Sequence, residues 1–190
     1  MVLTARVAAA ALLASAAWVW MRSAQDAQAS DATDWTEIGD DLLNSARNAL
    51  GMWRAPQRFA QLIADAEEAA GLPAMLLERL LYQESRYRDD IITGRVRSSA
   101  GALGIAQFMP ATAAQLGIDP LDPAQAIPAA ARYLRGLYRT FGNWTEALAA
   151  YNWGQGNVAR KGLAQAPRET RLYYSQILAD VNSTAGTAYA

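Results

Sequence analysis

The sequence contains no cysteine and no histidine, and Lys161 is its only lysine. Without cysteine the chain has no disulfides and no thiolate zinc site. Without histidine it has no imidazole metal ligand and no base of the Ser-His or Cys-His type. The net charge of −1 argues against a nucleic-acid-binding protein, which usually carries a basic face. Any acid–base chemistry must therefore come mainly from carboxylates or tyrosines.

The residues that are present suit one globular domain with an appendage. The 190 residues are 52% hydrophobic and 18% charged, which is too apolar for a disordered chain. We divide the chain into a signal peptide or membrane anchor (1–29), an amphipathic connector helix (30–56), a main domain (57–182) and a flexible tail (183–190).

The N-terminal segment 7–21 is uncharged, largely apolar and flanked by arginines. Its fifteen residues are short for a membrane span, which needs about 20, and they fit the core of a signal peptide. Small residues at 27–29 would suit cleavage. Trp18 and Trp20 would instead suit the interface of an uncleaved anchor. Both interpretations send the rest of the chain across a cytoplasmic membrane, to a periplasmic or inner-membrane-anchored location.

Apolar residues recur every three or four positions over 34–53, which predicts an amphipathic helix. Its first part is acidic, and acidic charge is unfavourable beside an anionic membrane. We expect the apolar stripe to pack on the following domain or on a second copy of the chain. Docking of a partner protein through the same helix is the alternative.

Beyond residue 56 the sequence predicts a mainly α fold. The apolar spacing over 59–70 ends at Gly71, a residue favoured at helix C-caps. Pro73 suits the first turn of a next helix that runs to about Tyr87. Further helices are expected at 111–117, 123–141, 144–151 and 170–181, and a long loop at 89–110.

The helix that ends near Tyr87 carries a carboxylate on its apolar face. Glu84 follows three leucines at helical spacing, namely Leu77, Leu80 and Leu81. The charged residues expected on the opposite, exposed face are Glu78, Arg79 and Arg86. An inward carboxyl group either finds a partner or takes up a proton. Glu84 is thus either a structural residue held by an arginine or backbone donors, or a general acid suited to glycosidic cleavage.

Three further segments extend the pattern. Residues 104–110 read Gly-Ile-Ala-Gln-Phe-Met-Pro, residues 150–154 read Ala-Tyr-Asn-Trp-Gly, and residues 169–173 read Glu-Thr-Arg-Leu-Tyr. With the pair Glu84-Ser85, they resemble in order and spacing the catalytic domain of soluble lytic transglycosylases, a lysozyme-like family that cuts peptidoglycan. The chain departs from the family at Ala106, where methionine is usual, and at Trp153, where a small residue is usual.

The resemblance implies a lysozyme-like helical fold over 57–182. It implies cleavage of the β-1,4 bond between N-acetylmuramic acid and N-acetylglucosamine, with Glu84 as the single acid and base and a 1,6-anhydro product. Neither a metal nor an organic cofactor is implied. The residues expected to bind substrate are Ser85, Gln107, Tyr151, Asn152 and Tyr173. Tyr151 is expected to hydrogen-bond Glu84 or the substrate, and Tyr173 to shape the site from behind Glu84.

Two other functions remain open. A lysozyme-type hydrolase would want a second carboxylate, for which Asp89 and Asp90 are candidates. A non-catalytic virion or envelope component would use the lysozyme-like module for binding or as a structural part, and a phage origin would make the protein virion-associated.

The expected partners follow from these functions. They are the glycan strands of peptidoglycan and, if the segment 7–21 is retained, the cytoplasmic membrane; nucleic acid is not expected. A basic cluster just after Glu84 is expected to meet the carboxylates of peptidoglycan. Its members are Arg86, Arg88, Arg95 and Arg97.

Overall fold

The computed structural model describes residues 53–185, which belong to the compact unit Gly51–Ala190. The predicted signal or anchor segment, 7–21, lies outside the described residues, as does all of the predicted 34–53 helix except Trp53. Within the described part, every helix is too short or too polar to cross a lipid bilayer.

Helices make up most of the described residues, and the only β-pairing among them is an isolated bridge between Leu103 and Phe108. The helical elements are α3 (Gln57–Ala70), α4 (Leu76–Ser85), α5 (Asp89–Ile92), α6 (Pro110–Leu116), α7 (Pro123–Phe141), α8 (Trp144–Trp153), α9 (Gln155–Lys161), η1 (Leu163–Gln165) and α10 (Arg168–Ala185). The prediction of a mainly α-helical domain is confirmed.

Several helix ends follow local sequence rules. Gly71 ends α3 in the left-handed conformation, with φ of 63°. Asp122 caps α7, because its side chain accepts a hydrogen bond from the N–H of Ala124 at 2.9 Å. Asn143 caps α8 in the same way, accepting from the N–H of Glu146 at 2.8 Å. These short-range bonds explain why the predicted starts of α7 and α8 are correct.

Three local predictions are wrong. The helix α4 begins at Leu76 rather than at Pro73, because the N–H of Leu76 bonds to the carbonyl of Pro73 in a turn and Met75 has a φ of 69°. The expected loop 89–110 contains the one-turn helix α5, and α9 follows α8 where no helix was predicted. Both missed helices are short, so their sequences show little periodicity.

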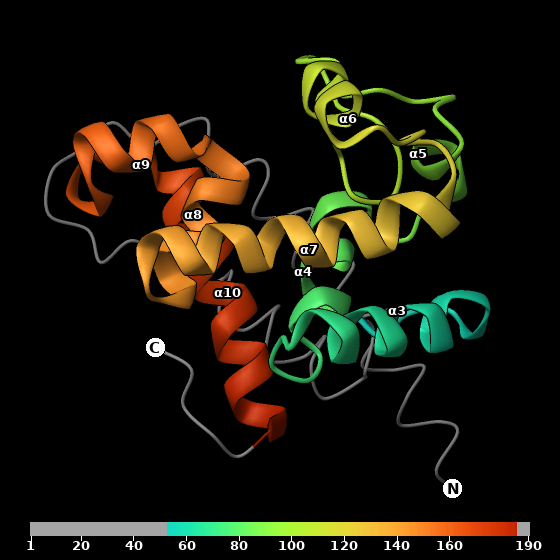
Figure 1. The fold of residues 1–190 in the computed structure, drawn as a ribbon, viewed down its shortest axis with the longest axis horizontal. Helices are drawn as coiled ribbons and strands as arrows, with labels where there is room; N and C mark the ends of the chain where they lie inside the picture. The colour runs from blue at the N-terminus through green and yellow to red at the C-terminus, as the bar shows by residue number, and fades with distance from the viewer. Residues whose placement is uncertain (1–52, 186–190) are drawn as a thin grey trace, which may run out of the picture. The chain divides into compact units, whose positions relative to one another are not determined.

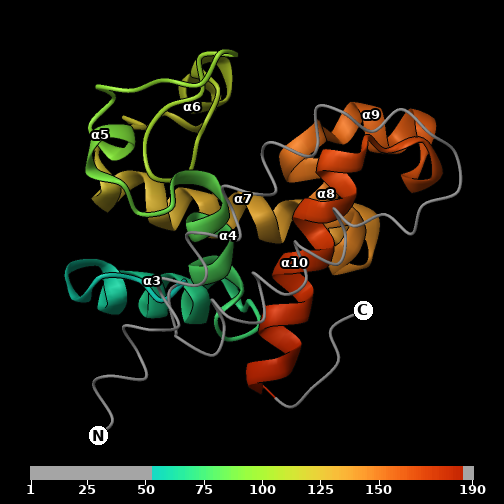
Figure 2. The ribbon, with the colours of Figure 1, turned by 180° about the vertical axis from the view of Figure 1, so that it is seen from behind.

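The long helix α7 runs through the described unit. In both views α5 and α6 lie toward its N-terminal end, and α8 and α9 lie toward its C-terminal end (Figure 1, Figure 2). The helix α3 packs against α7, and α4 packs against both α3 and α10. This arrangement brings α10, the last helix of the chain, into contact with α4.

The helix α4 is buried on more sides than its apolar stripe indicates. Its leucines are fully buried, but Glu78 and Arg79 are also only 7% and 2% exposed. The expectation that these two charges face solvent is therefore wrong. The physical reason is that α3, α10 and residues before α3 all pack around this one helix. Arg86 is exposed, as expected.

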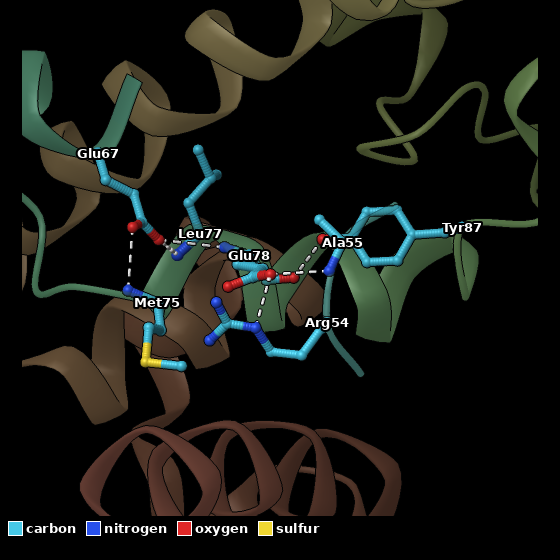
Figure 3. Close-up of polar contacts among 7 residues, drawn as sticks. All are labelled: Arg54, Ala55, Glu67, Met75, Leu77, Glu78 and Tyr87. Carbon is cyan, nitrogen blue, oxygen red and sulfur yellow. Dashed lines mark hydrogen bonds and ion pairs between the residues drawn. The ribbon is translucent and has the colours of Figure 1, made fainter. Parts of the chain in front are cut away.

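The N-terminal end of α4 is held by a carboxylate from another helix. Glu67 on α3 accepts hydrogen bonds from the N–H groups of Met75, Leu77 and Glu78 at 2.9, 2.7 and 3.1 Å (Figure 3). These are amides that a helix start leaves without partners, and no side-chain cap comes from the adjacent residue Met75. Glu67 thus caps α4 across a tertiary contact.

Glu78 connects this end of α4 to the segment that precedes α3 and to the turn that follows Ser85. Its carboxylate accepts from the N–H of Ala55 at 2.7 Å and lies 3.3 Å from Nε of Arg54 (Figure 3). The hydroxyl of Tyr87 donates to the carbonyl of Glu78 at 2.6 Å. Tyr87 has a φ of 52°, so this bond holds a turn that non-glycine residues rarely adopt.

Candidate active site

Glu84 lies on the last turn of α4, on the same face as Leu77, Leu80 and Leu81. The three leucines are fully buried, whereas the Glu84 side chain is half-buried. The carboxyl group therefore lies at the edge of the core and keeps some contact with solvent.

A tyrosine from α10 reaches this carboxyl group. The hydroxyl of Tyr173 donates to Oε1 of Glu84 at 2.6 Å, and the Tyr173 ring is 4% exposed. The two residues are 89 positions apart in the chain, and the packing of α10 on α4 brings them together. Tyr173, which the sequence analysis placed behind Glu84, is thus its hydrogen-bond partner.

The environment of Glu84 favours the protonated acid. Burial raises the pKa of its carboxyl group from 4.5 to about 7, and the negative charge of Glu169 adds to the rise. The hydrogen bond from Tyr173 opposes the rise, because it stabilises the charged form. With a pKa of about 7, the group can give a proton and take one back near neutral pH.

Tyr151 on α8 joins the site to the 104–110 segment. Its hydroxyl donates to the carbonyl oxygen of Ala106 at 3.0 Å. Its ring centre lies 6.1 Å from that of Phe108 and 5.6 Å from that of Tyr133. Burial, with the negative charge of Glu84, raises the pKa of Tyr151. Of the two contacts expected for Tyr151, the bond to Glu84 is made by Tyr173 instead, and the contact with substrate stays a prediction.

The 104–110 segment forms a tight turn that only glycine permits at its start. A Cβ on Gly104, whose φ is 74°, would lie 1.7 Å from the carbonyl oxygen of Pro120. The turn is closed by two backbone hydrogen bonds between Leu103 and Phe108, at 3.0 and 3.1 Å. Gln107 is half-buried, and its Nε2 donates to the carbonyl of Gly104 at 2.8 Å.

Ser85 and Asn152 differ in their access to a ligand. Ser85 is fully buried, and its hydroxyl donates to the carbonyl of Leu81 at 3.0 Å and accepts from the N–H of Tyr87 at 3.2 Å. Asn152 is exposed, and its Oδ1 accepts from the hydroxyl of Thr170 at 2.8 Å. Ser85 stabilises the turn after Glu84, and its predicted contact with a sugar would require these bonds to break.

The two departures from the family pattern lie in different surroundings. Ala106 is fully buried, so its side chain belongs to the core. Trp153 is half-buried and packs against the core, with Nζ of Lys161 5.3 Å from its ring centre. Stacking of Trp153 on a sugar stays a prediction.

The two aspartates that could serve a hydrolase form ion pairs. Asp89 pairs with Arg58, and Asp90 lies 2.6 Å from Nη2 of Arg88. The bond from Arg88 lowers the pKa of Asp90, so this carboxylate is charged at neutral pH. Both pairs are largely solvent-exposed.

The predicted basic cluster is only partly available to a ligand. Arg88 is paired with Asp90, and the Arg86 guanidinium lies 4.7 Å from the ring centre of Tyr82. Arg95 and Arg97 are exposed on the segment between α5 and α6.

Sequence reasoning missed Glu67, Tyr133 and Thr170. Glu67 follows Ile63 by four residues on the apolar face of α3. The same helical spacing that indicates an inward carboxylate at Glu84 therefore also indicates one at Glu67. Tyr133 and Thr170 carry no such signal, because only the packing of α7 and α10 against α8 brings them to Tyr151 and Asn152.

Fold and site together define a mainly α-helical domain with a partly buried glutamic acid, whose pKa is raised to about 7, beside two buried or half-buried tyrosines. The family model of the transglycosylase SLT domain matches residues 61–174, and the chain belongs to that family.

Several named proteins are similar to this chain. Peptidoglycan transglycosylase gp16 of Escherichia phage T7 is 35% identical over 117 residues, which are 57% of this chain and 8% of gp16. Membrane-bound lytic murein transglycosylase F 2 of Alkalilimnicola ehrlichii is 32% identical over 162 residues, 77% of this chain and 34% of that protein. The transglycosylase of Enterobacteria phage PRD1 is 35% identical over 95 residues, half of this chain and 34% of that protein. This chain therefore spans between 8% and 34% of the length of these relatives.

Solved structures show the same fold. The 70 kDa soluble lytic transglycosylase Slt70 of Escherichia coli aligns with a TM-score of 0.57 and 28% identity, over 69% of this chain and 25% of Slt70. An inactive mutant of lytic transglycosylase Slt from Pseudomonas aeruginosa aligns with a TM-score of 0.55 and 24% identity, over 66% of this chain and 24% of that one.

Proposed function

We propose that this chain is a lytic transglycosylase that cleaves the β-1,4 bond between N-acetylmuramic acid and N-acetylglucosamine in peptidoglycan, on a lysozyme-like helical domain. The observation that carries the proposal is the Glu84 carboxyl group, half-buried, held by one phenol and with a pKa of about 7. Family membership adds support, as do relatives named for peptidoglycan or murein transglycosylase activity.

In the proposed reaction Glu84 acts first as an acid and then as a base. The protonated carboxyl group gives its proton to the glycosidic oxygen as the bond to C1 of the muramoyl residue breaks. The acetamido group of the same sugar supports the developing positive charge, a substrate-assisted route that needs no second carboxylate. Glu84 then takes the proton of the 6-hydroxyl as that oxygen bonds to C1, which leaves a 1,6-anhydro end and restores the acid.

The surrounding residues receive distinct roles in this proposal. Tyr173 holds the Glu84 carboxyl group in one orientation through the bond to Oε1. Tyr151 and Gln107 are half-buried and Asn152 is exposed, so each keeps contact with the solvent from which a glycan strand would come. Ser85 acts on the turn after Glu84 rather than on a sugar, because its hydroxyl bonds to backbone groups on both sides.

The hydrolytic alternative is less well supported. A hydrolase of the inverting type places a base and its water across the bond from the acid, at roughly 6.5–9.5 Å. Asp89 and Asp90 are each held by an arginine at the surface, in the first turn of the short helix α5. The bond from Arg88 lowers the pKa of Asp90 and so makes that carboxylate a weaker base, which favours the lyase.

The substrate fixes where the protein would act. Peptidoglycan lies outside the cytoplasmic membrane, so the proposal includes export through the segment 7–21, either as a cleaved signal peptide or as an anchor. Sequencing of the mature N-terminus distinguishes them, because a start at Ser30 excludes an anchor. A virion-associated location is the corresponding proposal for a phage origin.

Digestion of purified peptidoglycan tests the proposal. We expect the full chain to release soluble muropeptides whose ends are lighter by one water than a reducing end in mass spectrometry. Glu84→Gln, which keeps the side chain's shape, should release none above background. Reducing ends would establish the hydrolase instead. Binding to peptidoglycan without any release by the folded wild-type protein would establish the non-catalytic component.

A further inference from the structure

Arg79 on α4 and Asp180 on α10 form an ion pair inside the domain. Nε of Arg79 donates to Oδ2 of Asp180, and the two side chains are only 2% and 3% exposed. Nη1 of Arg79 also donates to Oε1 of Gln83 at 2.9 Å, next to Glu84 in sequence. The pair therefore joins the helix that carries Glu84 to the helix that carries Tyr173.

The ion pair and the Glu84–Tyr173 bond join the same two helices at two levels. On α4, Arg79 precedes Glu84 by five residues, or about 7.5 Å along the axis. On α10, Asp180 follows Tyr173 by seven residues, two turns on the same face. The pairing order is opposite on the two helices, so α4 and α10 run past each other in opposite directions.

A buried ion pair is a poor source of stability, because removing two charges from water costs as much as their attraction returns. Its geometry, however, is directional, and a shift of one helix along the other breaks it. The apolar contacts of the buried α4 leucines carry no such directional requirement, because the hydrophobic effect is non-directional. The pair therefore suits the task of fixing register.

We propose that Arg79 and Asp180 are positioning residues that set the register of α10 on α4, so that the Tyr173 hydroxyl meets Glu84. The inference rests on the proposed function only where it concerns activity. The titratable groups around the bond are Tyr173 and Glu169 from α10 and Tyr151 from α8, with Arg79 acting on Tyr173.

The experiment compares the full chain with the double variant Arg79→Met/Asp180→Leu, which replaces the pair by apolar side chains of similar size. The hydrogen bond from Tyr173 lowers the pKa of Glu84 in the wild-type protein. If the helices lose their register, that bond is lost and the pKa of Glu84 should rise. It is measured by carbon NMR of the labelled Glu84 carboxyl group. On a soluble glycan strand, kcat should fall by up to about fivefold, the loss expected for removal of the Tyr173 bond itself. KM should stay within about twofold, because misplacement affects the reacting group rather than binding. Circular dichroism checks that the variant is folded.

Three comparisons make the result decisive. In a Tyr173→Phe background the double substitution should leave the pKa of Glu84 unchanged, because the bond is already absent. The control Gln61→Ala/Asp65→Ala, which removes an exposed hydrogen bond on α3, should alter neither quantity. If the double variant does not fold, Asp180→Glu takes its place. It keeps the charge but displaces the carboxylate by one methylene, and should move the pKa in the same direction.

The proposal would be overturned if the folded double variant had the same Glu84 pKa as the wild type. It would also be overturned if the double substitution shifted the Glu84 pKa as much in the Tyr173→Phe background as in the wild type. The titration is independent of catalysis, so it decides the positioning role even if the wild-type protein releases no fragments. Absence of wild-type activity would count against the proposed function alone.

Discussion

Glu67 and Glu84 both lie on the apolar face of a helix, and burial raises the pKa of both carboxyl groups. Their hydrogen-bond partners differ. Glu67 accepts from three backbone N–H groups at the start of α4, and these bonds oppose the rise in its pKa. Glu84 accepts from a single phenol, and the charge of Glu169 adds to the rise.

The comparison shows what separates a structural carboxylate from a reactive one. Backbone N–H groups have fixed positions, can only donate hydrogen bonds, and stabilise the charged form of the carboxylate. Glu67 therefore serves as a helix cap. A single phenol donor leaves Glu84 with further oxygen lone pairs that can accept hydrogen bonds, and its pKa lies near neutrality. Inward position on a helix is common to both residues and does not distinguish them.

The largest expected effect is on activity. Glu84→Gln should lower the release of muropeptides by roughly a thousandfold or more, in the range expected for loss of a general acid. Glu67→Gln, the same substitution at the other carboxylate, should leave activity per folded molecule within about threefold. Comparable losses in the two variants, assayed at equal folded concentration, would remove the distinction.

Stability should respond in the opposite order. Glu67→Ala leaves amides at the start of α4 without partners and should lower the free energy of unfolding by about 2–4 kcal/mol. Urea denaturation at pH 7 measures the change. Glu67→Gln keeps an acceptor oxygen and should lose less. A neutral Glu67→Ala substitution would show that the cap contributes nothing.

Removal of the Glu84 charge should stabilise the protein, but only at high pH. Because the folded-state pKa is about 7 and the unfolded value about 4.5, ionisation opposes folding as the pH rises through this interval. Below pH 4 both states are protonated and the penalty vanishes. Glu84→Gln should therefore gain up to about 3 kcal/mol over wild type at pH 8 and nothing at pH 4. An equal gain at both pH values would contradict the high pKa.

The smallest effect concerns the phenol. Tyr173→Phe removes the one bond that lowers the pKa of Glu84, so the alkaline limit of activity should move to higher pH. The rate at pH 6 should fall about fivefold, as for loss of one hydrogen bond of about 1 kcal/mol. Tyr138→Phe is a matched control, because that ring stacks on Trp144. An unchanged pH profile in Tyr173→Phe would show that the bond does not tune Glu84.

Local sequence patterns predicted much of the helical framework. The C-cap glycine after α3 and the starts of α7 and α8 depend on bonds within a few residues, which the sequence displays directly. The positions of α5 and α9 could not be predicted in this way, because one or two turns carry too little periodicity.

The burial of the charged side chains on α4 could not be predicted from the sequence of that helix alone. A single apolar stripe predicts one buried face, yet Arg79 is buried because α10 supplies Asp180, and Glu78 because the residues before α3 supply partners. Partners 23 and 101 positions away leave no trace in local spacing.

Helical spacing by itself predicted a mainly α-helical domain with an inward carboxylate at Glu84, and the absence of cysteine and histidine limited its acid–base chemistry mainly to carboxylates and tyrosines. Short-range periodicity suffices for that, since a helix face is set by residues three and four apart. Only the tertiary structure decided which inward glutamate is a cap and which is an acid. That difference depends on the groups that α4 and α10 bring to each carboxyl, and therefore on contacts between residues far apart in the chain.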